Sequence, residues 1–191
     1  MSSLTSATVD IDRAIAVVAL AFSADPVNRW AYPDAHTYYL HYPSFVRAFS
    51  GRAFETGGAF VTEGYEGVAL WLSPGVHPDE EALAAITEES VPPERLEGLS
   101  QLLELQSMTH PTEPHWYLPM IGVDPLHQGK GIGSQLLREG LSVCDQAGLP
   151  AYLEATNEGS RALYLRHGFE VMTELQVSGS PPVWPMWRRP R

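Results

Sequence analysis

Apolar side chains in the first quarter of the chain recur at helical spacing. Residues 10–24 follow this spacing behind Asp10, a suitable N-cap, so we predict a helix there that Pro26 ends. A second helix is predicted over 36–54, and Pro43 must kink it or begin a new turn. The chain therefore opens with helices rather than strands.

The pattern then changes. Residues 59–62 and 68–72 are short apolar runs on either side of a polar turn, as in a β-hairpin. The segment 73–111 is proline-rich at both ends and fits two helices, about 79–89 and about 93–108. Because some 35 residues rarely fold alone, we interpret this segment as a helical insertion or lid.

Strands and helices alternate in the remainder of the chain, which predicts an α/β layer with helices packed on a sheet. We expect one domain over 1–191. The expected elements are a strand at 116–123, a helix at 132–147, a strand at 150–156, a helix at 159–167, and final strands at 169–177 and 183–188.

Composition and charge narrow the function classes. Hydrophobic residues make up 44% and charged residues 18%, as in ordinary globular proteins. The net charge of −11 argues against nucleic-acid binding and fits weakly with a cationic substrate. No apolar run approaches a membrane span, and the acids before the run 14–22 argue against a signal peptide, so a cytoplasmic protein is expected. The single cysteine excludes an intrachain disulfide.

A glycine-dense segment carries the strongest chemical signal. Gly129, Gly131 and Gly133 alternate where a predicted strand turns into a helix, so backbone N–H groups and the helix dipole can meet an anion. A phosphate or pyrophosphate is the expected ligand. The spacing matches neither the Walker A loop nor the dinucleotide fingerprint. A tight strand-to-helix turn is the alternative interpretation.

The segment resembles a more specific signature. Gln128-Gly129-Lys130-Gly131-Ile132-Gly133 is similar to the Gln/Arg-x-x-Gly-x-Gly/Ala motif of the GNAT superfamily of N-acetyltransferases. Downstream, the segment from Asn157 to Phe169 resembles the family's Asn-x6-Tyr-x3-Gly-Phe motif, with Tyr164 as its tyrosine. The resemblance implies the GNAT fold, a mixed central sheet with splayed parallel strands 4 and 5 flanked by helices. Details such as the Phe22-to-Pro26 turn look like the puromycin N-acetyltransferase branch.

The resemblance also implies acetyl-CoA as co-substrate. Backbone groups at the end of strand 116–123 would pair with the pantetheine arm, the loop and helix start would bind the pyrophosphate, and Asn157 would bind the arm or simply cap a helix. The implied cofactor-binding residues are Ile121, Gly122, Val123, Gln128, Gly129, Lys130, Gly131, Ile132, Gly133, Ser134, Asn157, Ser160 and Tyr164.

Tyr164 stands where the family places its general acid, which assists departure of the thiolate. The position equivalent to the family's usual base is Tyr117, a poor base at neutral pH. His115 lies nearby on the same strand face. We favour Glu154 acting through water, because a carboxylate between apolar strand residues is unusual unless it is reactive or paired. A salt bridge from Glu154 to Arg161 or Arg166 is the alternative.

We therefore expect acetyl transfer to a primary amine of a small molecule, of the kind found in antibiotics. Candidate acceptor-site residues are Trp30, Tyr32, His115 and Tyr117, although core packing explains the aromatics equally well. Acetylation of a protein N-terminus or lysine, and a non-catalytic acyl-CoA sensor, are the alternatives. No metal site is expected, since the histidines lack ligand spacing. Whether strand 183–188 pairs within a homodimer stays open.

Overall fold

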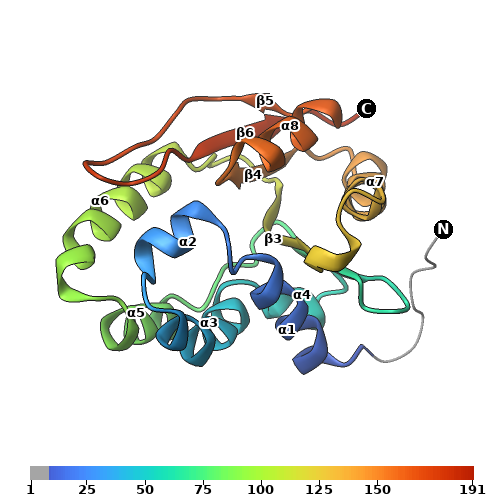
Figure 1. The fold of residues 1–191 in the computed structure, drawn as a ribbon. Helices are drawn as coiled ribbons and strands as arrows, with labels where there is room; N and C mark the ends of the chain where they lie inside the picture. The colour runs from blue at the N-terminus through green and yellow to red at the C-terminus, as the bar shows by residue number, and fades with distance from the viewer. Residues whose placement is uncertain (1–8) are drawn as a thin grey trace.

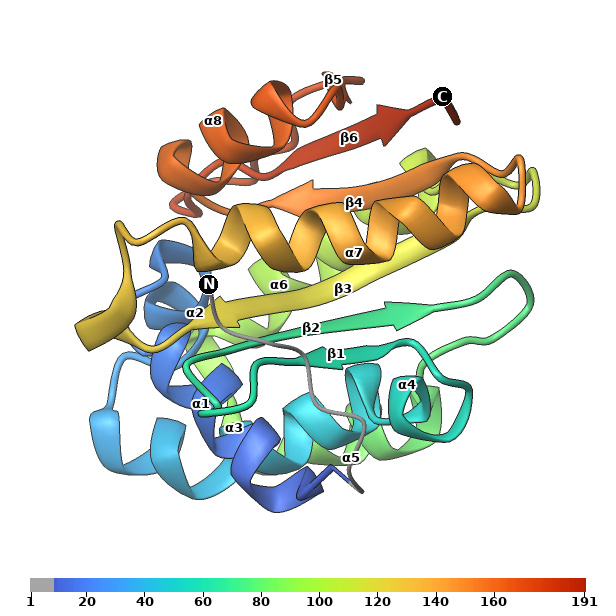
Figure 2. The ribbon, with the colours of Figure 1, turned by 90° about the vertical axis from the view of Figure 1, so that its right-hand side faces the viewer.

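The computed structural model describes residues 9–191, whose strands form one mixed six-stranded sheet in the order β1-β2-β3-β4-β6-β5. Every neighbouring pair is antiparallel except β3 and β4, which are parallel. Figure 2 shows the strands side by side, with α7 in front of the sheet and running along them. The strands are β1 Ala59–Val61, β2 Gly67–Leu72, β3 Trp116–Val123, β4 Ala151–Ala155, β5 Glu170–Val171 and β6 Trp184–Arg188.

Helices cover both faces of this sheet (Figure 1). The N-terminal helices and the two helices between β2 and β3 lie on one side, and α7 and α8 lie on the other. The helices are α1 Ile11–Ala21, α2 Pro26–Ala31, α3 Ala35–Ser50, α4 Arg52–Glu55, α5 Glu80–Ser90, α6 Pro93–Thr109, α7 Ile132–Gln146 and α8 Glu158–Arg166, with a 3-10 turn at Pro125–His127.

Strand alternation divides the apolar residues into two cores. Along β2, Val68 and Leu70 face the core beneath α1 and α3, whereas Ala69 and Trp71 face α7. The large Trp71 ring fits because α7 carries Gly140 opposite it. A Cβ at Gly140 would lie 2.2 Å from the indole nitrogen, so this contact requires glycine.

The parallel pair separates soon after it forms. β3 and β4 are paired only at Trp116↔Ala151 and Tyr117↔Tyr152. On its other edge, β3 has a register shift against β2 in the stretch containing Pro119, as expected where a residue lacks a backbone donor. The C-terminal half of β3 therefore diverges from β4. The predicted GNAT fold, with its splayed parallel strands, is confirmed.

Most predicted elements are present, including the hairpin and the helices of the 73–111 segment, now α5 and α6. The final strand predicted at 169–177 is wrong in extent, because β5 stops at Val171 and only an isolated Leu175↔Val183 bridge follows. Pro185 on β6 offers no N–H to continue the ladder.

Two further boundaries differ from the prediction. The first helix ends at Ala21 rather than near residue 24, and Pro26 begins α2 behind the capping carboxylate of Asp25. α3 continues through Pro43 without a break.

β6 is flanked by β4 and β5 of its own chain. None of the helices in residues 9–191 combines the length and hydropathy that crossing a bilayer requires.

Candidate active site

A cavity of about 830 Å³ opens where β3 and β4 diverge. Its walls come from the end of β3, the start of α7, the β4–α8 junction and the α1–α2 turn. The two helices between β2 and β3 also contribute, through Leu83 and Thr87 of α5 and through Leu99, Leu102 and Gln106 of α6. Segments far apart in the sequence therefore enclose one space large enough for an organic ligand.

The glycine-dense loop has the backbone geometry expected of an anion-binding turn. Gly129 and Gly131 have φ angles of 74° and 83°, in the left-handed region that favours glycine. Gly131 is the N-cap of α7, and no side chain caps this helix end. The first N–H groups of α7 lack intrahelical acceptors, as at every helix start, and they border the cavity. Phosphate oxygens suit this position.

Nearly all the residues assigned to cofactor binding line the cavity. Lys130 does not, and its ammonium donates to the Leu126 carbonyl, 3.1 Å away. The lining members are Ile121, Gly122, Val123, Gln128, Gly129, Gly131, Ile132, Gly133, Ser134, Asn157, Ser160 and Tyr164.

Several of these residues also make contacts within the protein. The Gln128 carboxamide donates to the Val123 carbonyl at 3.1 Å. The Ser134 hydroxyl lies 2.9 Å from Nε2 of His167. A Cβ at Gly122 would lie 2.8 Å from Cβ of Ala21, so this glycine permits close packing of α1 on β3.

Asn157 has the capping role considered as its alternative, since its side chain accepts from the Ser160 N–H at 2.9 Å. Its amide nitrogen donates to Asp25, which also accepts from the Thr156 hydroxyl. Asp25 is 6% exposed and also caps α2, and burial raises its pKa. These hydrogen bonds, which join α2 to the β4–α8 junction, were not predicted from the sequence. The Asp-Pro pair at the start of a helix was their only local signal.

Tyr164 is buried between α8 and the sheet, and it borders the cavity. Its ring lies 6.0 Å from that of Phe169, and no side chain or backbone group among residues 9–191 hydrogen-bonds its hydroxyl. Burial, and secondarily the Asp25 carboxylate, raise the pKa of this phenol well above its usual value. The hydroxyl therefore keeps its proton at neutral pH and can donate it in a hydrogen bond.

Glu154 lies on β4 with its side chain 9% exposed, and it lines the cavity. Its carboxylate accepts hydrogen bonds from Tyr117 at 2.8 Å and from Tyr152 at 2.9 Å. Burial raises the pKa of Glu154 to about 7, although both hydrogen bonds oppose the shift.

The suggested salt bridge from Glu154 to Arg161 or Arg166 does not form. Arg161 pairs with Glu158 at 2.9 Å and lies over the Trp184 ring. The partners of Glu154 are instead the two tyrosines. A carboxyl group whose pKa lies near neutrality, beside a ligand-sized cavity, has the properties of a general base.

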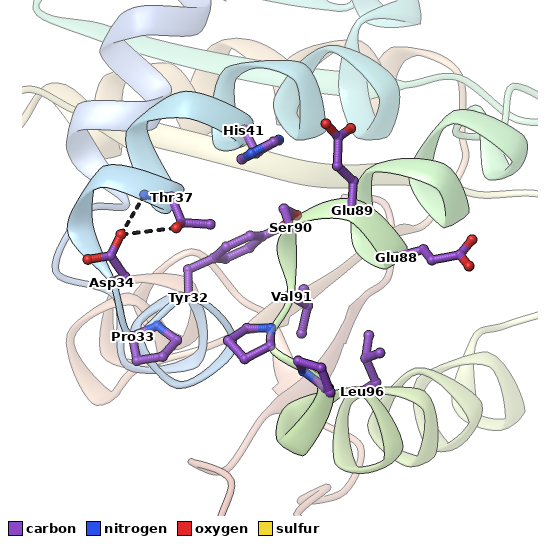
Figure 3. A pocket seen from close by; sticks show the side chains of 12 residues that line it. Tyr32, Pro33, Asp34, Thr37, His41, Glu88, Glu89, Ser90, Val91 and Leu96 are labelled. Atoms are coloured by element: carbon purple, nitrogen blue, oxygen red, sulfur yellow. Dashed lines mark hydrogen bonds between the residues drawn. The ribbon is translucent and has the colours of Figure 1, made fainter.

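The four candidate acceptor residues separate into two groups. Tyr32 and Tyr117 line the large cavity, whereas Trp30 and His115 are absent from its lining. Tyr32 also borders a second cavity of about 410 Å³ (Figure 3). Asp34, Glu88 and Glu89 are among the residues that line this second cavity, and Figure 3 shows Tyr32 extending toward Ser90. Tyr32 therefore belongs to both cavities.

Comparison with known proteins agrees with this geometry. The model of the acetyltransferase (GNAT) family matches residues 97–169, which include β3, the glycine loop, α7, β4 and α8. An uncharacterised N-acetyltransferase of Schizosaccharomyces pombe is 26% identical, over 84% of this chain and 70% of its own.

Two solved structures share the fold over the whole chain. One, described as histone acetyltransferase HPA2 and related acetyltransferase of Corynebacterium glutamicum, has a TM-score of 0.69 at 24% identity, over 100% of this chain and 98% of its own. The other, arylalkylamine N-acetyltransferase 2 of Aedes aegypti, has a TM-score of 0.65 at 15% identity, over 99% of this chain and 100% of its own.

Proposed function

We propose that this chain, an acyltransferase of the GNAT superfamily, transfers an acetyl group from acetyl-CoA to a primary amine of a small molecule. One observation carries the proposal. The cavity at the strand splay is lined at once by residues of the glycine loop, by the part of β3 that is free of β4, by Glu154 and by Tyr164. Groups suited to binding a nucleotide thioester, activating an amine and stabilising a thiolate therefore face a single space.

Acetyl-CoA supplies the activated acyl group, and two features of the chain suit its binding. The N-terminus of α7 and the left-handed glycines present N–H groups to the pyrophosphate. Beyond Tyr117 the edge of β3 is released from β4, so its backbone can pair with an amide-bearing arm as an added strand does. In this proposal Ile121 and Val123 hold the pantetheine arm, and Asn157 and Ser160 lie at its flank.

Glu154 is the proposed general base. Amines are protonated at neutral pH and cannot attack until they lose a proton. A carboxylate with a pKa of about 7 can accept that proton directly or through a water molecule. The neutral nitrogen then forms the C–N bond as the C–S bond of the thioester breaks. In this proposal, backbone N–H groups near Val123 stabilise the carbonyl oxygen of the thioester.

Tyr164 is the proposed general acid, acting on the departing thiolate. Its hydroxyl has no partner within the described chain, so donation to sulfur would break no existing hydrogen bond. Because the pKa of the phenol is raised, full proton loss is unfavourable and a strong hydrogen bond is the main contribution.

The shape and lining of the cavity favour a small acceptor. Residues of α5 and α6 form part of the cavity wall, whereas a protein acceptor would need an open groove. Phe45 and Phe49 of α3, together with Tyr32, add an aromatic wall. The Aedes aegypti neighbour is named for arylalkylamines, which combine an aromatic ring with an amine. The net charge of −11 also favours a cationic substrate. The resemblance to the puromycin N-acetyltransferase branch stays a prediction.

Mass spectrometry of acetyl-CoA reactions with a panel of amines tests the proposal. The panel contains 2-phenylethylamine, puromycin, polyamines, an aminoglycoside, amino acids and a lysine peptide. We expect a mass gain of one acetyl group on a small amine, and much slower product formation by a Glu154→Gln control. Acetylation of the peptide alone would support a protein acetyltransferase. Cofactor binding without transfer to any acceptor would support the sensor alternative.

A further inference from the structure

Glu154 lies beside one of two neighbouring histidines, which packs against the rings of both phenols. Its Oε1 lies 4.0 Å from Nδ1 of His110, the residue that follows α6. Nε2 of His110 lies 3.2 Å from Nε2 of His115, and Nδ1 of His115 lies 2.7 Å from the Glu113 carbonyl oxygen. The large cavity has Glu154 in its lining and neither histidine. The three side chains form a row from the cavity toward the exposed 112–114 loop.

We propose that His110 and His115 form a proton-exit relay, which carries the proton removed by Glu154 from the cavity to solvent. The relay rests on the proposed function, because it presupposes that Glu154 is the base.

The hydrogen bonds determine which ring nitrogen carries each proton. A carbonyl oxygen only accepts, so Nδ1 of His115 must be the N–H donor to Glu113. In a neutral His115 ring, Nε2 is then the acceptor. Nε2 of His110 must therefore carry the proton that joins the two rings. This leaves the lone pair of Nδ1 of His110 directed toward Glu154.

Protons balance along this row. When His110 accepts a proton from Glu154 at Nδ1, it gives its Nε2 proton to Nε2 of His115. His115 then releases its Nδ1 proton to solvent. Both rings remain neutral and exchange tautomers, and a flip of each ring then restores the starting tautomers without returning the proton to Glu154. The 4.0 Å gap exceeds a hydrogen bond, so a small rotation of His110 or one bridging water must precede the first transfer.

The other neighbours of Glu154 cannot take its proton. Tyr117 and Tyr152 both donate to the carboxylate, and burial raises the pKa of each phenol. His110 is the remaining titratable group in contact with it among the described residues. Burial, followed by repulsion from His115 and His77, lowers the pKa of His110 to about 4. His110 therefore stays neutral, as simultaneous uptake and release of a proton requires.

Aromatic packing holds the two rings in place. His110 packs edge-to-face on Tyr152 at 4.5 Å and on Tyr117 at 5.1 Å between ring centroids. His115 packs on Trp187 at 5.6 Å. These contacts favour the ring orientation that points Nδ1 of His110 at Glu154 between transfers.

Nitrogen-15 NMR of the histidine rings tests the proton positions without any need for activity. We expect His110 as the Nε2–H tautomer and His115 as the Nδ1–H tautomer at pH 7.5, with signals assigned by His110→Phe and His115→Phe variants. The reverse tautomer in either ring would overturn the relay.

Kinetics with 2-phenylethylamine, or the best acceptor from the amine panel, test the transfer itself. His110→Phe keeps the ring packing and removes both nitrogens, so we expect kcat to fall by at least about tenfold with the KM for acetyl-CoA unchanged. Added imidazole should restore part of kcat, which a purely structural loss would not allow. His36→Phe, at an exposed histidine on α3, is the matched control.

The two proposals fail in different ways. A kcat of His110→Phe within twofold of wild type, in an enzyme that Glu154→Gln inactivates, would overturn the relay and leave the base assignment intact. Absence of transfer by the wild-type protein would contradict the proposed function, and the relay with it.

Discussion

The Tyr117 hydroxyl donates a 2.8 Å hydrogen bond to Oε2 of Glu154, although the two residues are 37 positions apart. Tyr117 is paired with Tyr152 in the parallel register, and Tyr152 donates to the other carboxylate oxygen. Two phenols thus hold one buried carboxylate at the point where the strands separate. Tyr117, which we predicted from the sequence to be equivalent to the family's usual base, hydrogen-bonds the proposed base instead.

Replacement of Glu154 by Gln removes the proposed base with little change in shape. We expect kcat to fall by roughly 10²- to 10³-fold, in the range that general base catalysis contributes. In the wild type, kcat/KM should rise with pH through about 7, because only the carboxylate form of Glu154 accepts a proton. Steady-state assays from pH 5.5 to 8.5 measure both effects. Glu139→Gln, at an exposed site on α7, should behave as wild type.

Stability should depend on the same group. The folded-state pKa of Glu154, about 7, exceeds the ordinary glutamate value of 4.5, so folding favours the protonated form. The contribution of Glu154 to the free energy of unfolding is fully present below pH 4.5 and is lost as the pH rises through 7.

Urea unfolding at pH 5 and pH 8 tests this sign. Relative to Glu154→Gln, the wild type should lose on the order of 3 kcal/mol of unfolding free energy between these values. The lowered pKa of His110 affects both proteins similarly and largely cancels in the comparison. A constant difference between the two proteins would show that Glu154 titrates at its ordinary pKa.

Tyr164→Phe removes a hydroxyl that has no partner within residues 9–191. We expect the melting temperature to change by less than a few degrees, whereas kcat falls by roughly tenfold to a hundredfold. Thermal unfolding and product formation, measured on the same preparation, separate these effects. An enzyme that keeps full kcat would remove Tyr164 from the mechanism.

Gly131, in the glycine-dense loop, and Gly148, at the other end of α7, are a matched pair of sites for testing the anion-binding role of the loop. Both have positive φ, 83° and 65°, and a Cβ on either would meet nothing within 4 Å. Substitution of either glycine by alanine should therefore lower the free energy of unfolding by a similar amount, about 1–2 kcal/mol, because a residue with a Cβ is strained at positive φ. Only Gly131 borders the cavity at the N-terminus of α7.

Calorimetric titration with CoA distinguishes the pair. We expect Gly131→Ala to weaken CoA binding by at least about tenfold, and Gly148→Ala to leave it within about twofold of wild type. Equal weakening in both variants would place the pyrophosphate elsewhere.

The sequence by itself determined the elements with local signals. The glycine loop, the capping residues Asp10 and Asn157, and the 116–123 strand were all predictable, because their geometry depends on neighbours in the chain. Glu154 stood out as a carboxylate among apolar strand residues. Strand 169–177 failed because its length depended on Pro185, which lies on another strand.

Only the tertiary structure decided the environment of these residues. Three sets of contacts join residues that are far apart in the sequence. They are the hydrogen bonds of the phenols to Glu154, the approach of His110 to the same carboxylate, and the buried hydrogen bonds of Asp25. The raised pKa of Glu154 likewise results from burial, which the packing of α6 and α3 over the sheet creates. Sequence spacing identifies groups capable of chemistry, whereas long-range packing sets their protonation and their partners.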